Sequence, residues 1–167
     1  MKRIFCIVVI FLLTGNTEGQ EIKRAKATDL EKLITESKTP LIVNMWATWC
    51  KPCIEEIPYF LEEVKNHNDK LRGQSDSILL LLVSLDFKEA FPEAISRFVE
   101  KRKFTAPVAW LDETNADYFC PKIDAKWSGA IPATLFINNK TGYRKFIEEQ
   151  ISHENLKKEL KAVVEKK

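Results

Sequence analysis

The segment that most constrains the fold is Cys50-Lys51-Pro52-Cys53, because it lies between a strand pattern and a helix pattern. Residues 41–45 are almost wholly apolar, which is typical of a short strand buried on both faces. Pro52 suits the first turn of a helix, where its missing N–H would have no intrahelical partner. Apolar residues then recur at helical spacing, at Ile54, Ile57, Phe60, Leu61 and Val64. The sequence therefore predicts that a buried strand ends, and a helix begins, at the cysteine pair.

This placement suits the pair to reversible disulfide chemistry. Residues three apart on a helix lie roughly 5–6 Å apart at Cβ, close to disulfide range. The positive end of the helix favours a thiolate at Cys50, and Lys51 adds a nearby cation. A Cys50 thiolate could attack a substrate disulfide, and Cys53 could then resolve the mixed disulfide.

Two metal-binding readings of the cysteine pair compete with the redox reading. Half of a zinc site would need two further cysteine or histidine ligands. Outside the N-terminal segment the other candidates are Cys120, His67 and His153, which are scattered without ligand spacing. A copper-carrier reading lacks a third soft ligand placed near the pair. The pattern favours redox chemistry and predicts no metal and no cofactor.

Two segments carry a family resemblance: Trp46-Ala47-Thr48-Trp49-Cys50-Lys51-Pro52-Cys53 and Ile131-Pro132-Ala133-Thr134. Together they resemble the thioredoxin superfamily, and more narrowly the TlpA/ResA-like thiol–disulfide oxidoreductases of bacterial envelopes. The matching segments cover most of the chain from about Thr28 onward, loosely in the middle. The resemblance implies a thioredoxin fold and a cis Pro132 that faces the cysteines. We expect the substrate to contact four residues: Trp49, Pro52, Ile131 and Pro132.

The alternative for Pro132 is an ordinary proline that opens an edge strand, since most X–Pro bonds are trans. The fit of the whole Ile-Pro-Ala-Thr segment favours the family's cis proline.

Glu56 is the candidate proton carrier. Plain thioredoxins keep a buried acid on the strand before the cysteines, where this chain has Asn44, which cannot exchange a proton. In the TlpA/ResA-like group a glutamate three residues after the second cysteine resembles a substitute, and Glu56 stands there. Burial could raise its pKa and let it serve Cys53. The alternative is a solvated glutamate like Glu55, but adjacent helical residues point about 100° apart, so only one is expected to face the site.

The N-terminus resembles an export signal. Residues 1–3 include two basic side chains, and residues 4–13 form an apolar run too short to span a bilayer. We expect a signal peptide over residues 1–19, cleaved near Gly19, and one thioredoxin-like domain over residues 20–167. An uncleaved membrane anchor is the alternative, because the cleavage site is imperfect. Export to the periplasm or cell envelope would place the cysteines where disulfides form.

The remaining pattern predicts an α/β fold with a central mixed sheet covered by helices on both faces. Thr28 and Glu31 suggest a capping box for a first helix, and Ser152 is predicted to cap the last helix. A polar loop is expected over residues 66–77, and a helical turn that Pro121 stops over residues 114–120. Further elements are a central parallel strand at 78–86, an inserted helix at 89–103, an inserted strand at 107–111, and a hairpin over 134–147.

Composition sets the size and the partners. The 167 residues are 45% hydrophobic and 30% charged, with a net charge of +2, which suits one globular domain with no nucleic-acid footprint. The expected function is a thiol–disulfide oxidoreductase, used as a reductase, acting as a monomer on cysteine-containing envelope proteins and fed by a membrane electron donor. The alternative is a redox-sensitive binding module that uses the cis-proline groove without turnover.

Cys120, among aromatic neighbours, is predicted to be buried and unreactive.

Overall fold

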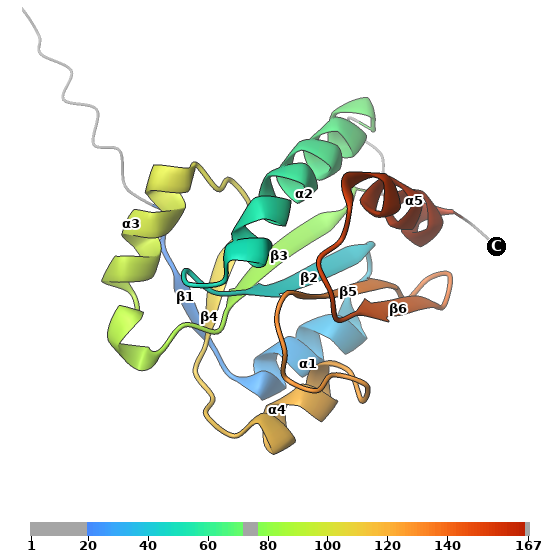
Figure 1. The fold of residues 1–167 in the computed structure, drawn as a ribbon. Coiled ribbons are helices and arrows are strands. Elements are labelled where there is room, and N and C mark those ends of the chain that lie inside the picture. Colours follow the sequence, from blue (N-terminus) through green and yellow to red (C-terminus); the bar gives the residue numbers. More distant parts are fainter. Residues whose placement is uncertain (1–19, 72–76, 166–167) are drawn as a thin grey trace, which may run out of the picture.

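The computed structural model describes residues 20–71 and 77–165, so the predicted signal peptide lies outside the described residues. Six strands form one sheet in the order β1-β4-β3-β2-β5-β6 (Figure 1). The strands are β1 (Lys23–Ala25), β2 (Leu41–Trp46), β3 (Leu79–Ser84), β4 (Val108–Leu111), β5 (Ala133–Asn138) and β6 (Tyr143–Ile147). The helices are α1 (Ala27–Glu36), α2 (Lys51–Lys70), α3 (Glu93–Arg102), α4 (Ala116–Ile123) and α5 (His153–Val164), with a 3-10 turn, η1, at Lys88–Ala90.

The sheet is mixed, as the sequence predicts. β2 pairs with β3, β3 with β4, and β4 with β1, all in parallel. β5 runs antiparallel to β2, and β6 antiparallel to β5. All six residues of β2 are buried, because this strand has neighbours on both sides and helices on both faces.

Helices cover the two faces of the sheet as separate layers. Figure 1 shows α2, α3 and α5 on one face and α1 and α4 on the other. Because strand residues alternate between faces, Ile42 and Trp46 pack toward α2, whereas Leu41, Val43 and Met45 pack toward α1 and α4. The same alternation places Asn44 on the α2 face, within the buried core.

Two helix boundaries differ from the sequence predictions. α1 begins at Ala27, so Thr28 and Glu31 lie inside the helix rather than at a capping box. The carboxylate of Asp29 instead accepts the backbone N–H of Lys26 at 2.8 Å. Lys26 has extended backbone angles and is the residue before the helix, so α1 begins two residues earlier than a cap at Thr28 would place it.

The helix α2 continues to Lys70, into the stretch predicted to be a loop. Lys65 and Asp69 form an ion pair one turn apart, at 2.5 Å. The side chain of Asn68 bonds the backbone of Ile78 at both its N–H (2.8 Å) and its carbonyl (3.0 Å). These contacts stabilise a polar last turn that hydrophobic periodicity does not reveal.

Three smaller features were also absent from the sequence analysis. The helix predicted from residue 89 is divided into η1 and α3, with a cis Phe91–Pro92 bond between them. The prediction that Pro121 stops a helical turn is wrong: α4 runs from Ala116 to Ile123 with Pro121 inside it, and the backbone N–H of Asp124 donates to the Cys120 carbonyl at 2.9 Å. β1 has only three residues, two of them exposed and charged, and it forms by pairing with the edge of β4.

The C-terminal part follows the prediction closely. Gly142 has a positive φ of 71° in the turn between β5 and β6, a conformation that favours glycine. Ser152 caps α5 by accepting the N–H of Asn155 at 3.3 Å. Leu156, Leu160 and Val163 form the buried stripe of this helix. Within residues 20–71 and 77–165, no helix is long and apolar enough to cross a membrane.

Candidate active site

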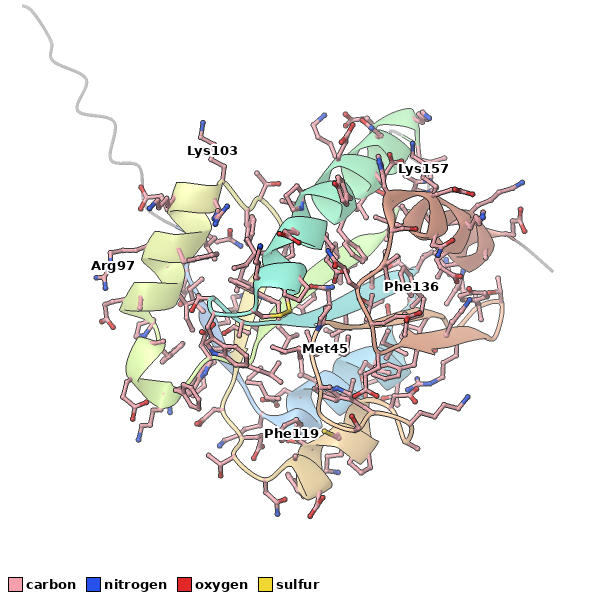
Figure 2. All side chains as sticks on the ribbon, viewed as in Figure 1. Met45, Arg97, Lys103, Phe119, Phe136 and Lys157 are labelled. Carbon is pink, nitrogen blue, oxygen red and sulfur yellow. A yellow bond between two sulfur atoms is a disulfide. The ribbon has the colours of Figure 1, made fainter. Side chains whose placement is uncertain are left out.

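The two cysteines form a disulfide at the start of α2. Cys50 is the residue immediately before the helix, and Cys53 lies in its first turn. Their Cα atoms are 5.4 Å apart and the S–S bond measures 1.99 Å. Figure 2 shows this sulfur–sulfur bond at the end of α2 that lies against the sheet. Cys50 keeps 5% of its surface exposed and Cys53 keeps none, so an incoming thiolate reaches Cys50 first.

Lys51 contributes less to the site than its sequence position indicates. Its side chain is 85% exposed, and its ammonium lies 3.8 Å from the carboxylate of Glu55. Water and this counter-charge screen its field at Cys50. The orientation of Cys50 at the helix N-terminus is therefore the main structural feature that favours a thiolate there.

Glu56 is fully buried one turn beyond Cys53. Its Oε1 accepts a hydrogen bond from Asn44 Nδ2 at 2.9 Å, and its Oε2 accepts the backbone N–H of Ile151 at 2.7 Å. Burial raises the pKa of Glu56 from 4.5 to about 7, against the opposing effects of the Ile151 and Asn44 hydrogen bonds. Glu55 points to solvent, as the 100° offset between neighbours requires.

Asn44 and Thr134 form a directly opposed pair across β2 and β5. Asn44 Nδ2 donates to Thr134 Oγ1 at 2.9 Å as well as to Glu56. Both side chains are fully buried on the α2 face of the sheet. Position 44 on the strand thus carries an amide that contacts the acid supplied by the helix.

Pro132 lies where the sequence analysis expects it. The Ile131–Pro132 bond is cis. The pairing of β2 with β5 ends at Met45 and Ala133, which leaves Pro132 beside the carboxyl end of β2, where the loop to Cys50 begins. Pro132 is buried and Ile131 is half-buried against the core.

An exposed aromatic pair flanks the disulfide. Trp49, next to Cys50, is 58% exposed, and it stacks on Phe87, which is 72% exposed, with ring centroids 6.3 Å apart. Phe87 follows β3, the strand next to β2 in the sheet. Large apolar rings exposed to this extent are typical of binding surfaces.

Asp86 holds this aromatic pair in place. Its carboxylate is buried and accepts both the backbone N–H of Thr48, at 3.1 Å, and the Thr48 hydroxyl, at 2.6 Å. It also accepts the hydroxyl of Ser84 at 2.7 Å. The indole N–H of Trp110 donates to the Asp86 carbonyl at 2.7 Å. The loops that carry Trp49 and Phe87 are therefore joined by hydrogen bonds.

No role was predicted from the sequence for Asp86, Phe87, Thr134 or Ile151. One available signal was that Asp86 follows a parallel strand next to β2, because adjacent parallel strands end at the same edge of a sheet. Thr134 could have been paired with Asn44 only from the strand register. No local pattern marks Ile151, which contributes a backbone N–H.

Cys120, His67 and His153 lie outside the site. Cys120 is a free, buried thiol on α4, and burial, with smaller effects of Glu148 and Asp117, raises its pKa to about 11. His153 contacts Glu63 at 2.8 Å at the start of α5. In the part of the chain that the structure describes, no three His, Cys, Asp or Glu side chains gather as a metal site.

The fold and the disulfide define a thioredoxin-like thiol–disulfide oxidoreductase, and comparison with known proteins agrees. No family model matches the chain. The thiol-disulfide oxidoreductase ResA of Bacillus anthracis is 31% identical over 153 residues, which cover 89% of this chain and 77% of that protein. ResA of Bacillus cereus strain ZK / E33L is 29% identical over 153 residues, which again cover 89% of this chain and 77% of that protein. The chain belongs to the ResA-type thiol–disulfide oxidoreductases of the thioredoxin superfamily.

Solved structures give the same fold. StoA from Bacillus subtilis has a TM-score of 0.56 at 24% identity, covering 76% of this chain and 86% of that one. A DsbF homologue from Corynebacterium diphtheriae has a TM-score of 0.57 at 16% identity, covering 78% and 75%. At these identities the similarity shows the fold alone.

Proposed function

We propose that the chain is a reductase of disulfides in exported proteins, with Cys50 as nucleophile, Cys53 as resolving cysteine and Glu56 as proton carrier. The observation that carries this proposal is the burial of Glu56 one turn beyond the Cys50–Cys53 disulfide. A carboxyl with a pKa of about 7 can both take and give a proton near neutral pH.

The reaction has two exchange steps. In the reduced protein, the Cys50 thiolate attacks one sulfur of the substrate disulfide, forms a mixed disulfide and releases the first substrate thiolate. Glu56 then takes the proton of the Cys53 thiol. The Cys53 thiolate attacks Cys50, closes the internal disulfide and releases the second substrate thiolate. The substrate gains two electrons, and the protein is left oxidised, as it is in this structure.

Substrate binding is proposed at the rim of the disulfide. Pro132 and Ile131 would line one side of the groove, and Trp49 and Pro52 the other. Phe87 extends the Trp49 side, since the two rings stack. Apolar side chains next to the substrate cysteine would then cover rings that are otherwise exposed to water.

The cellular setting completes the proposal. The chain would be exported to the periplasm or cell envelope, work as a monomer and act on cysteine-containing envelope proteins. A membrane electron donor would return Cys50 and Cys53 to thiols after each turnover. Trapping the in vivo thiol state by rapid alkylation tests the direction, since a reductase is kept mostly reduced and an oxidase mostly oxidised.

Reduction of insulin by dithiothreitol tests turnover itself. We expect a rate well above the uncatalysed reaction for the wild type and the background rate for Cys50→Ser. A wild-type rate at background would support the binding-module alternative instead. Glu56→Gln should slow exchange at neutral pH by more than Glu55→Gln, and equal small effects would remove the proposed role of Glu56.

A further inference from the structure

One carboxylate binds the loop of residues 128–130, which leads directly into Ile131 and Pro132. Glu148 Oε1 accepts the backbone N–H of Ser128 and that of Ala130, each at 3.0 Å. The Ser128 hydroxyl donates to the same oxygen. Hydrogen bonds to an ionised acceptor are roughly twice as strong as neutral ones. Three such donors from one short segment make Glu148 the main polar contact of this loop.

The strand register explains why Glu148 lies at this loop. β6 runs antiparallel to β5, and Ile147, the last residue of β6, is paired with Thr134. Antiparallel strands continue in opposite directions, so the residue after Ile147 lies beside the residues that precede Ala133. Glu148 is half-buried there, whereas the next residue, Glu149, is exposed. Pairing between distant segments of the chain thus brings this one carboxylate to the loop.

Two further contacts restrict the 128–130 loop. The indole N–H of Trp127 donates to the Ala130 carbonyl at 2.8 Å. Gly129 has a positive φ of 98°, and a Cβ added at this residue would lie 3.6 Å from Cys120 Sγ on α4. The loop therefore packs against α4 and is bonded by Glu148 to the chain that follows β6.

The loop continues into residues that we expect to contact the substrate. Pro132 lies beside the carboxyl end of β2, where the chain turns toward Cys50. Ile131 packs against the buried residues of both faces of the sheet. Both residues follow Ala130 directly, so a shift of the loop would move them relative to the disulfide. Small misplacements of groups that face a substrate are costly to an enzyme.

We propose that Glu148 is a positioning residue: its carboxylate oxygen binds the 128–130 loop and thereby fixes Ile131 and Pro132 opposite the Cys50–Cys53 disulfide. The inference rests on the proposed function, since it takes these two residues as part of the substrate groove. Glu148 itself touches no reacting atom. Its effect is on the affinity for substrate, and the exchange step between the sulfur atoms is left unchanged.

Three substitutions separate the position of the oxygen from its charge. Glu148→Ala removes the acceptor, and Glu148→Asp keeps the charge but is one methylene too short to reach the loop. Glu148→Gln loses the charge but can keep an acceptor oxygen at the Oε1 position. On a peptide disulfide with dithiothreitol as reductant, we expect Glu148→Ala and Glu148→Asp to raise KM about fivefold, with kcat unchanged within about twofold. Glu148→Gln should stay within about twofold of the wild-type KM.

Glu149→Ala is the matched control and should leave KM unchanged, because its side chain is exposed. If Glu148→Asp behaves as the wild type and Glu148→Gln behaves as Glu148→Ala, Glu148 acts through its charge and the proposal is wrong. A lower free energy of unfolding for Glu148→Ala with an unchanged KM would also overturn it, because the contact would then be structural only.

Amide hydrogen exchange in the oxidised protein tests the loop contact without any turnover. The N–H groups of Ser128 and Ala130 should exchange roughly tenfold faster in Glu148→Ala and Glu148→Asp than in the wild type. Glu148→Gln should keep most of the protection. Equal exchange rates in the wild type and Glu148→Ala would show that the carboxylate does not hold the loop, and would overturn the proposal.

Failure of this inference is distinguishable from failure of the proposed function. Calorimetry measures binding of the same peptide with serine in place of its cysteines. Background turnover by the wild type, together with a weaker peptide affinity in Glu148→Ala, would reject the reductase and support the positioning role. Normal turnover with KM and peptide affinity unchanged in Glu148→Ala would keep the reductase and reject the positioning role.

Discussion

Asp86 binds Thr48 twice, through the Thr48 backbone N–H at 3.1 Å and its hydroxyl at 2.6 Å. This contact joins the loop that leads into Cys50 to the loop that follows β3. The two loops carry Trp49 and Phe87, whose rings stack beside the disulfide. A buried carboxylate thus sets the position of the apolar rim on which we expect substrates to bind.

Thr48→Val should therefore destabilise the protein by about 2 kcal/mol, because it removes a donor to a buried carboxylate while keeping the side chain's shape. Urea unfolding of the oxidised protein measures this loss. Thr35→Val is the matched control: its hydroxyl bonds carbonyls of its own helix at an exposed position, so its change should stay within about 0.5 kcal/mol. Equal effects of the two variants would contradict the anchoring role of Asp86.

Glu56→Gln should change the pH dependence of stability. The folded protein keeps the Glu56 proton up to a pH of about 7, whereas the unfolded chain releases it near the ordinary pKa of 4.5. The raised pKa therefore lowers the wild-type free energy of unfolding as pH rises through this window, by about 3 kcal/mol in total. Relative to the wild type, Glu56→Gln should gain that amount between pH 4.5 and a pH above 7.

Denaturant unfolding of the oxidised forms at several pH values measures this gain, since disulfide-bonded cysteines do not titrate. Glu55→Gln is the control and should follow the wild type, because Glu55 is exposed. If the free energies of unfolding of Glu56→Gln and the wild type differ by the same amount at every pH, burial does not raise the pKa of the Glu56 carboxyl.

The cysteine variants should separate nucleophile from resolver. Cys50→Ser should abolish exchange, because the attacking thiolate at the start of α2 is lost. Cys53→Ser should accumulate mixed disulfides with substrate, seen as reducible adducts on non-reducing gels. Adducts on Cys50→Ser instead would reverse the two assignments.

Phe87→Ala should weaken substrate binding and leave the rate of the exchange step nearly unchanged. Loss of an exposed aromatic contact worth about 1 kcal/mol corresponds to a roughly fivefold rise in KM, with kcat little changed. Steady-state kinetics on a peptide disulfide with an apolar residue beside its cysteine measures both constants. Tyr118→Ala, a 45% exposed aromatic on α4 across the sheet, should leave KM unchanged. A similar KM for both variants and the wild type would exclude Phe87 from the binding surface.

Cys120 should be nearly inert. With a pKa of about 11, its thiol is almost entirely protonated at neutral pH, and it lies buried on α4, on the opposite face of the sheet from α2. Native oxidised protein that lacks residues 1–19, and with them Cys6, should show almost no thiol reacting with a mild reagent, and one per chain after denaturation. Cys120→Ala should keep the wild-type rate of insulin reduction. Fast native labelling, or a dimer that requires Cys120, would make it a functional thiol.

The spacing of residues along the chain was sufficient to predict the cysteine pair, the helix after it and the strand before it. Apolar periodicity and the position of Pro52 depend on near neighbours, which the sequence displays directly. The choice of Glu56 over Glu55 followed from the family resemblance and from helix geometry. The cis Pro132 followed from the resemblance alone.

Contacts between distant residues were decided only by the tertiary structure. Asn44 meets Thr134 and Glu56 because β2 pairs with β5 in one register and α2 packs on the same face, so residues 90 positions apart come within 2.9 Å. The same holds for Asp86 with Thr48 and for β1 on the edge of β4. The reactive pair and its helix were predictable because both depend on local spacing along the chain. The environment that sets the pKa of Glu56 depends on burial, which only the packing of the whole chain creates.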